Sequence, residues 1–370
     1  MIEIPFLKPK VIPYEKYVNY LKYIDESKIY SNYGPLNRMF EDRILLEYFN
    51  GIGAVTTVNN ATTGLILAIN ELKRPRGKYA LMPSFTFSAT PLAAMWCGLE
   101  PYFIDIDENT WEMDRDHLSS ALNRLGDEVA IVIPYATFGN NIDLSYYSLI
   151  HQQGIPVVID AAPGFGASDQ GTQFGQDFSG AVVYSFHATK PFGIGEGGLV
   201  YSSDEEIIHK VRASGNFGYL GTRESKSMGL NSKLPELFAA IGLATLDHLS
   251  EKIASRLRVI ESYQKELEAH NLISLGWKTQ QTTGQIPHQF FSVLCPVGEY
   301  NDYYIKKLGE KKIQALKYFS PACHEQEQFI KFFHSDLTIT EGISKRILSL
   351  PFWEGMEQDT ISRIIKTLIS

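Results

Sequence analysis

The sequence predicts an α/β protein: a large domain with a mixed, mostly parallel sheet of about seven strands between helices, and a smaller C-terminal α+β domain. Short apolar, β-branched runs recur through residues 54–203, as expected of strands buried on both faces. Helical patterns separate these runs, and this alternation favours a sheet covered by helices on both sides. The length of 370 residues suits about two domains.

The elements follow in chain order. The first fifty residues have the pattern of an N-terminal helical arm. A helix over Leu65–Leu72 carries apolar residues at the spacing of an amphipathic face. Strands are expected at Ala54–Val58, Tyr79–Pro83, Pro101–Asp105, Ala130–Pro134, Pro156–Asp160, Ala181–Phe186 and Leu199–Ser202. Ligands of such sheets bind beyond the carboxyl ends of the strands, so the strand ends are where chemistry is expected.

A long helical pattern, Leu234–Leu249 and on through Ile253–Leu267, predicts the connector into the smaller domain. That domain has two strand candidates and a closing helix, at Gln289–Cys295, Lys317–Phe319 and Asp359–Leu368. We therefore divide the chain into residues 1–250, the arm and the large domain, and residues 251–370, the small domain.

Composition excludes several classes of protein. A formal net charge of −8 gives no basic footprint for nucleic acid. The three cysteines, Cys97, Cys295 and Cys323, lie far apart, which fits a reducing compartment and argues against a cysteine-ligated metal or cluster. The N-terminus has no signal-peptide pattern, and no run approaches the ~18 apolar residues of a membrane span. We expect a soluble, cytoplasmic protein.

Lys190 is the most informative residue. It follows a predicted buried strand in the run Ser185-Phe186-His187-Ala188-Thr189-Lys190 and precedes the glycine-dense stretch Gly193–Gly198. Glycines let a backbone approach a ligand closely. A lysine at the mouth of a parallel sheet suits a Schiff base to a phosphorylated aldehyde, and pyridoxal 5'-phosphate (PLP) is the obvious candidate. The competing interpretation is a surface lysine in a turn.

Asp160 ends the run Val157–Asp160. A carboxylate at the end of a buried strand is costly without a partner, so a cationic partner is expected. A protonated pyridine nitrogen would supply one and keep the ring an electron sink. A structural ion pair or a helix cap explains the residue equally well.

Three further segments carry weaker signals. Ala61, Thr62 and Thr63 lie at the start of a predicted helix, where backbone N–H groups bind anions, although plain capping is the simpler interpretation. Phe87 follows the second strand and could stack on a planar cofactor, although aromatic residues are more often core. Asn231 precedes the long helix and by itself suggests a cap.

The histidines give no metal signal. His187 lies between an aromatic residue and an alanine, where a histidine is usually a satisfied structural side chain. No HxxxH or paired-carboxylate pattern recruits His187 or His324 to a metal, and we expect none.

Taken together, these segments resemble the DegT/StrS family of sugar aminotransferases, which are PLP enzymes of the aspartate-aminotransferase fold, type I. The resemblance runs in order along nearly the whole chain. The matching blocks are Tyr33–Pro35 with Phe40-Glu41, Asn59–Leu65, Pro83–Thr90, Phe103–Asp107, Ser185–Lys190 with Gly195–Gly198, Gly229–Asn231 with Glu236 and Ala239–Gly242, Pro321–His324, and Leu350–Phe352 with Met356. The block around Lys190 is the most specific.

The resemblance implies roles for individual residues. Lys190 would form the internal aldimine and then act as the acid and base of the proton transfer. Asp160 would pair with the pyridine nitrogen, and Phe87 would stack on the ring. Ala61, Thr62, Thr63 and Ser185 would bind the cofactor phosphate, and Asn231 would reach that phosphate from the other subunit of a homodimer.

The resemblance also implies the substrates. L-Glutamate would donate the amino group through pyridoxamine phosphate to a nucleotide-linked keto-6-deoxyhexose, most plausibly dTDP-4-keto-6-deoxyglucose. His324 and Lys317 are candidate substrate contacts. A 3-keto-sugar aminotransferase, a sugar dehydratase of the same family and a catalytically inactive cofactor-binding regulator stay open as alternatives.

Two positions depart from the family pattern. Pro163 stands where the family commonly has a glutamine near the ring hydroxyl, and proline cannot donate a hydrogen bond. Ser232-Lys233 replaces a common Tyr-Arg, and lysine is a point charge rather than a bidentate fork. Neither position carries the central chemistry.

Overall fold

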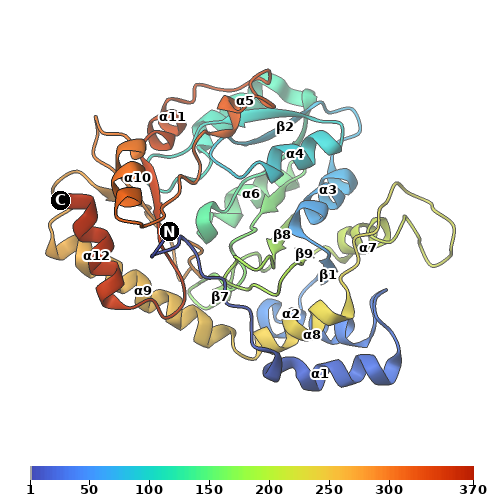
Figure 1. Cartoon of the computed structure of the whole chain (residues 1–370). Helices are drawn as coiled ribbons and strands as arrows, with labels where there is room; N and C mark the ends of the chain where they lie inside the picture. The colour runs from blue at the N-terminus through green and yellow to red at the C-terminus, as the bar shows by residue number, and fades with distance from the viewer. Residues whose placement is uncertain (1) are drawn as a thin grey trace.

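A computed structural model describes residues 2–370, and its centre is one layer of strands (Figure 1). One group of hydrogen-bonded strands has the order β1 (Ala54–Val58), β9 (Gly198–Ser202), β8 (Ala181–Ser185) and β5 (Val158–Asp160). A second group has the order β3 (Glu100–Ile104), β2 (Tyr79–Pro83) and β4 (Val129–Val132). Isolated bridges, Val132 to Val157 and Tyr135 to Asp160, join the two groups. Among these seven strands β9 runs antiparallel to both neighbours, and the other pairings are parallel.

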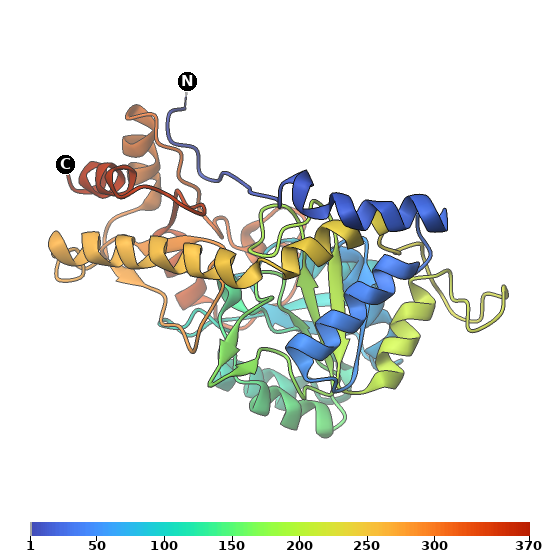
Figure 2. The same cartoon turned by 90° about the horizontal axis from the view of Figure 1, so that it is seen from below.

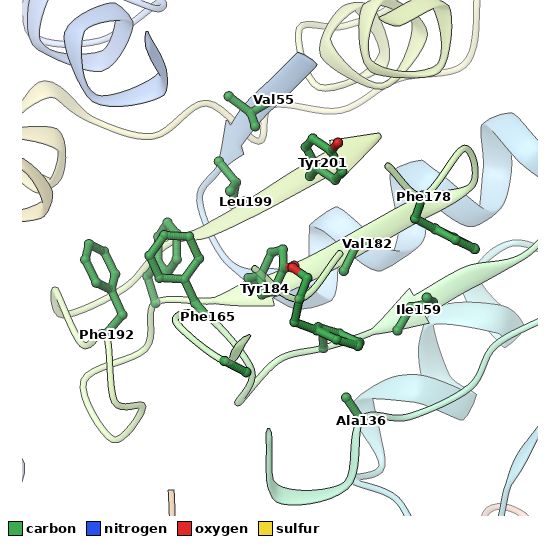
Figure 3. Packing of buried hydrophobic residues seen from close by; sticks show 14 of the residues in the cluster. Val55, Ala136, Ile159, Phe165, Phe178, Val182, Tyr184, Phe192, Leu199 and Tyr201 are labelled. Carbon is green, nitrogen blue, oxygen red and sulfur yellow. The ribbon is translucent and has the colours of Figure 1, made fainter. Parts of the chain in front are cut away.

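Both faces of this sheet are covered. Val182 and Tyr184 of β8 belong to one apolar cluster, shown in Figure 3, whereas Val183 belongs to the opposite cluster. The first cluster includes residues of α2 (Pro35–Phe49), α5 (Arg115–Leu125), α6 (Leu144–Gln152) and α8 (Glu236–Leu246). The second includes residues of α3 (Ala61–Leu72), α4 (Ala89–Trp96) and α7 (Glu205–Ser214). Continuously apolar strands are required because each strand is buried twice.

The N-terminal arm is helical, as expected. Helix α1 (Tyr14–Ser27) lies along α8, and α2 packs on both (Figure 2). The residues before α1 run as an extended segment to the C-terminal part of the molecule, where Ile4 pairs with Ile313. The arm therefore touches both halves of the chain.

The C-terminal part has its own sheet and its own core. Helix α9 (Leu249–Ala269) leads to three antiparallel strands, β10 (Lys278–Thr279), β11 (Phe291–Leu294) and β12 (Ile347–Leu350). Helices α10 (Asn301–Glu310), α11 (Thr338–Ser344) and α12 (Gln358–Ile369) complete it. A short hairpin of β6 (Ser168–Asp169) and β7 (Thr172–Gln173) lies outside the main sheet. The α/β class is confirmed, and the boundary at residue 250 stays a prediction.

Two predicted elements are wrong in detail. Lys317–Phe319 is a turn, in which Ser320 N–H donates to Lys317 O, and β12 takes the place of the expected second strand. The long helical pattern begins two residues late, after Pro235, and breaks at Asp247-His248 between α8 and α9. In residues 2–370, no helix is both long and apolar enough to cross a bilayer.

Candidate active site

The parallel strands bring the predicted chemistry to one edge of the sheet. Asp160 ends β5 and Ser185 ends the adjacent β8, and the loop after β8 carries Lys190. That loop is closed by a bridge between His187 and Gly195 and by Lys190 N–H donating to His187 O. Gly195 has a φ of +112°, which favours glycine. The backbone therefore fixes the point from which the Lys190 side chain leaves.

Lys190 is half-buried, and within residues 2–370 its amine has one hydrogen-bond acceptor. Its Nζ donates to Gln289 Oε1 at 3.0 Å. Burial lowers the pKa of Lys190 to about 8, although the Asp160 charge acts in the opposite direction. A lysine that loses its proton near neutral pH can act as a nucleophile or a base.

Asp160 is 2% exposed and has two donors, Thr90 Oγ1 at 2.6 Å and Ala162 N–H at 3.1 Å. Burial raises its pKa above the usual value, against the hydrogen bonds from Thr90 and Ala162 and the Lys190 charge. Among residues 2–370, no lysine, arginine or histidine nitrogen lies within 4.0 Å of this carboxylate. The Lys190 charge thus acts on this carboxylate without a close ion pair. A carboxylate at this edge of the sheet has the chemistry to pair with a protonated pyridine nitrogen.

The start of α3 forms a tight corner against the sheet. Asn60 is the N-cap and its Oδ1 accepts the Thr63 N–H at 2.9 Å, so the expectation that the threonines cap this helix is wrong. Thr63 Oγ1 lies 2.5 Å from Asn59 Oδ1, whereas Thr62 Oγ1 makes no hydrogen bond within residues 2–370. A Cβ on Gly198 would lie 2.9 Å from Ala61 N, so glycine permits this close approach. Free N–H groups at a helix start suit a phosphate.

Phe87 and Ser185 take different positions at this edge. The Phe87 side chain is 54% exposed, so the interpretation as core packing is wrong, and its ring centroid lies 6.4 Å from that of Phe319. An exposed ring just beyond β2 is free to stack on a planar group. Ser185 is buried, and its Oγ accepts the His187 N–H at 3.3 Å.

Asn231 is exposed and does not begin a helix, because Pro235 is the N-cap of α8. It forms a bridge with Asn216 at the base of the loop that projects from the body in Figures 1 and 2. The neighbouring Ser232 O accepts the Asn59 N–H at 2.6 Å, next to the start of α3. Lys233 Nζ donates to Asn216 Oδ1 at 3.0 Å, so this cation has a local partner.

The two candidate substrate contacts differ. His324 Nδ1 lies 2.7 Å from Ser84 Oγ, which ties the imidazole to the end of β2, three residues from Phe87. Lys317 Nζ instead pairs with Asp302 at 2.7 Å, and no described contact takes it to the strand-end edge. Throughout residues 2–370, no group of histidine, cysteine, aspartate and glutamate side chains is arranged to hold a metal ion.

Sequence reasoning missed Gln289 and Thr90. Gln289 is 4% exposed and begins a segment correctly predicted to contain a strand, so a buried polar residue in that position was the available signal. Thr90 lies within the block Pro83–Thr90, but its contact with Asp160 spans 70 residues. Lys190 provides an amine, Asp160 a carboxylate, Phe87 an aromatic ring, and the start of α3 provides N–H donors for an anion. These are the groups that PLP requires.

Comparisons with known proteins agree with this assignment of chemistry. The model of the DegT/DnrJ/EryC1/StrS aminotransferase family matches residues 13–369. The crystal structure of a proposed PLP-dependent aminotransferase from Bacillus cereus ATCC 10987 is 51% identical, with a TM-score of 0.98 over 99% of this chain and 100% of that one.

Two further relatives carry substrate information in their names. The crystal structure of DesI in the presence of its TDP-sugar product is 31% identical, with a TM-score of 0.87 over 97% of this chain and 90% of that one. The dTDP-4-amino-4,6-dideoxy-D-glucose transaminase of Shigella dysenteriae is 27% identical over 98% of this chain and 97% of its own length.

Proposed function

The chain belongs to the DegT/DnrJ/EryC1/StrS aminotransferase family, whose members include PLP-dependent sugar aminotransferases, and we propose that it moves an amino group from L-glutamate to a nucleotide-linked keto-6-deoxyhexose. The observation that carries the proposal is the pair of Lys190 and Asp160 at one edge of the parallel sheet. One is a half-buried lysine whose amine has a pKa of about 8, and the other is a buried carboxylate.

Lys190 and Asp160 would divide the central chemistry. A bound PLP would supply an aldehyde that can take up an amino group and a ring that acts as an electron sink. The Lys190 amine would hold the cofactor aldehyde and, once released, move a proton at the carbon that carries the amino group. The Asp160 carboxylate would keep the ring nitrogen protonated, and Thr90 orients that carboxylate through a 2.6 Å hydrogen bond.

The remaining site residues would bind and orient. Phe87 would stack on the ring, because its exposed side chain lies just beyond β2. Ala61, Thr62, Thr63 and Ser185 would hold the phosphate at the start of α3 and the end of β8. We propose a homodimer with shared sites, in which Asn231 of the partner subunit reaches the same phosphate. The exposed position of Asn231 at the base of a projecting loop supports this role.

The proposed acceptor is dTDP-4-keto-6-deoxyglucose. The named activity of the Shigella relative and the TDP-sugar in the DesI structure support a thymidine nucleotide and amination at C4. His324 is the candidate contact to the substrate, since it lies beside the end of β2.

The test is an absorbance spectrum of the purified protein, before and after L-glutamate is added. We expect the band of lysine-bound cofactor to bleach to the aminated form, and dTDP-4-keto-6-deoxyglucose to restore the band and yield an amino sugar detected by mass spectrometry. If only a 3-keto sugar restores the absorbance band, the carbon that accepts the amino group is C3 rather than C4. If no amino donor changes the spectrum, the remaining functions are the sugar dehydratase and the inactive cofactor-binding regulator.

A further inference from the structure

Gln289 is the residue whose side chain meets the Lys190 amine. Its Oε1 accepts a hydrogen bond from Lys190 Nζ at 3.0 Å, and the residue is 4% exposed. Gln289 lies just before β11 in the C-terminal sheet, 99 residues from Lys190, which lies in the loop between β8 and β9. This single hydrogen bond therefore joins the two parts of the molecule at the reactive amine.

The backbone of Gln289 is held from behind by Arg256 of α9. Arg256 Nη2 donates to Gln289 O at 3.3 Å, and Arg256 Nε donates to His288 O at 2.8 Å. One planar guanidinium thus donates hydrogen bonds to two successive backbone carbonyls, which limits rotation of the backbone at His288 and Gln289. Gln289 is held in place by its own backbone and not only by its side-chain contact.

Arg256 is itself fixed by a buried ion cluster. Glu354 Oε1 lies 3.1 Å from Arg256 Nη1 and 3.0 Å from Lys252 Nζ, and the three side chains are only 7–8% exposed. Lys252 Nζ also donates to Lys10 O at 2.9 Å, which brings in the N-terminal segment. A buried carboxylate shared by two cations is geometrically demanding, so this cluster supports a defined position for Arg256 and hence for Gln289.

The neutral character of glutamine matters here. A buried N–H group needs an acceptor, and an amide oxygen satisfies it without a full negative charge. A carboxylate at the same distance would favour the ammonium form strongly and withhold the lone pair needed for bonding to an aldehyde. The observed acceptor fixes the nitrogen, while burial lowers the pKa of Lys190 to about 8.

We propose that Gln289 is a positioning residue that holds Lys190 Nζ at the strand-end edge without adding a negative charge that would keep the amine protonated. This inference rests on the proposed role of Lys190 as the residue that bonds to the cofactor. Gln289 acts on Lys190 from the opposite part of the molecule, so the amine is correctly placed only when the two parts are packed as described.

The test measures the Lys190 amine in the cofactor-free, full-length protein. Acetic anhydride acetylates neutral amines, and mass spectrometry of the Lys190 peptide between pH 6 and 10 gives the midpoint of its reactivity. We expect a midpoint of about 8 in the wild type. Q289E should raise the midpoint by at least about one pH unit, and Q289L should lower it. Ser292→Ala, a buried change on β11 away from Lys190, should leave it unmoved.

Opposite shifts in Q289E and Q289L support the proposal, and any other pattern overturns it. Glutamate has the shape of glutamine, so Q289E decides the question alone if Q289L loses the native circular dichroism spectrum. PLP is then added to each protein separately. Failure of wild-type Lys190 to bind PLP would overturn the proposed function without changing the acetylation result, so the two hypotheses fail independently.

Discussion

At the scale of single residues, the site depends on the environment of one amine. The Lys190 side chain is useful because burial lowers its pKa to about 8, whereas an exposed lysine stays protonated at neutral pH. Asp160 shows the complementary effect, since burial raises the pKa of its carboxyl group. Neither shift requires an unusual residue, because Asp160 ends a buried strand and Lys190 lies in the loop that follows one.

We expect Lys190→Ala to abolish the absorbance band of lysine-bound cofactor, because no other amine replaces the one that contacts Gln289. The measurement is a spectrum of the variant after it is mixed with PLP. Lys366→Ala, at an exposed position of α12, serves as the matched control and should keep the band. Full retention of the band in Lys190→Ala would contradict the assignment.

Asp160→Asn should leave the cofactor bound while kcat falls by ~100-fold, because an amide cannot stabilise a positively charged ring nitrogen. Bound cofactor is measured after denaturation, and kcat with L-glutamate and the keto sugar. Thr90→Val keeps the Asp160 charge and removes only its 2.6 Å hydrogen bond, so a smaller loss is expected. Unchanged turnover in Asp160→Asn would mean that another group protonates the ring.

At the scale of elements, helix starts are fixed by residues from elsewhere in the chain. The first N–H groups of α2 lack partners within the helix, and Glu236 of α8 accepts from Leu36 N–H at 2.8 Å and from Asn37 N–H at 2.9 Å. Gly34 is needed before α2, since a Cβ there would lie 2.7 Å from the Glu236 carboxyl group. One buried carboxylate therefore joins the arm to α8.

Glu236→Ala should lower the free energy of unfolding by ~2 kcal/mol, because two buried N–H groups lose their acceptor. Glu236→Gln keeps one carbonyl oxygen and should lose less. Urea denaturation measures both, with Glu261→Ala at an exposed position of α9 as the control. A loss in Glu236→Ala no larger than in the control would show that water replaces the carboxylate without penalty.

Glu112, just before α5, should make stability depend on pH. Burial raises its pKa to about 7, against the charge of Arg115 and the hydrogen bond from Asn140. The folded-state pKa lies above the unfolded value, so the contribution is complete at low pH and is lost as the pH rises through about 7. Glu112→Gln should have a higher Tm than the wild type at pH 8, and the two should converge near pH 5.

Thermal unfolding followed by circular dichroism at both pH values tests this dependence. Glu108→Gln, at an exposed position four residues earlier, should show no such convergence. A constant difference in Tm between the wild type and Glu112→Gln would mean that Glu112 is ionised in the folded protein throughout this range.

At the scale of the whole molecule, the C-terminal part packs against the main sheet. Cys323, Phe329 and Leu337 belong to the apolar cluster on one face of the main sheet. Asp105, at the end of β3, accepts hydrogen bonds from the Ile339 and Thr340 N–H groups at 2.9 and 2.8 Å, and so fixes the start of α11. The contact between Lys190 and Gln289 is one of several that cross from one part to the other.

Shared active sites can be tested with mixed dimers. Lys190→Ala and Asn231→Ala would each be inactive alone. If Asn231 of the partner subunit completes each site, a dimer of the two variants has one intact site. The isolated hybrid should then show about half of wild-type activity, and an equal mixture about a quarter. Coexpression with two affinity tags and an assay of the isolated hybrid measures this. No recovery in the hybrid would place Asn231 and Lys190 in the same site of one chain.

The sequence by itself determined the α/β class and the places of Lys190 and Asp160. Both are local properties, because a strand buried on two faces must be continuously apolar and the residues at and just after its end lie at the ligand-binding edge. The family resemblance, carried by blocks along the chain, supplied the cofactor.

Only the tertiary structure decided the partners of these residues. Thr90 meets Asp160 across 70 residues and Gln289 meets Lys190 across 99. Asn60, rather than either threonine, caps α3, and Lys317–Phe319 turns where its composition suggested a strand. The physical reason is that periodicity reports which face of an element is buried, whereas a hydrogen-bond partner is set by how distant elements pack against one another.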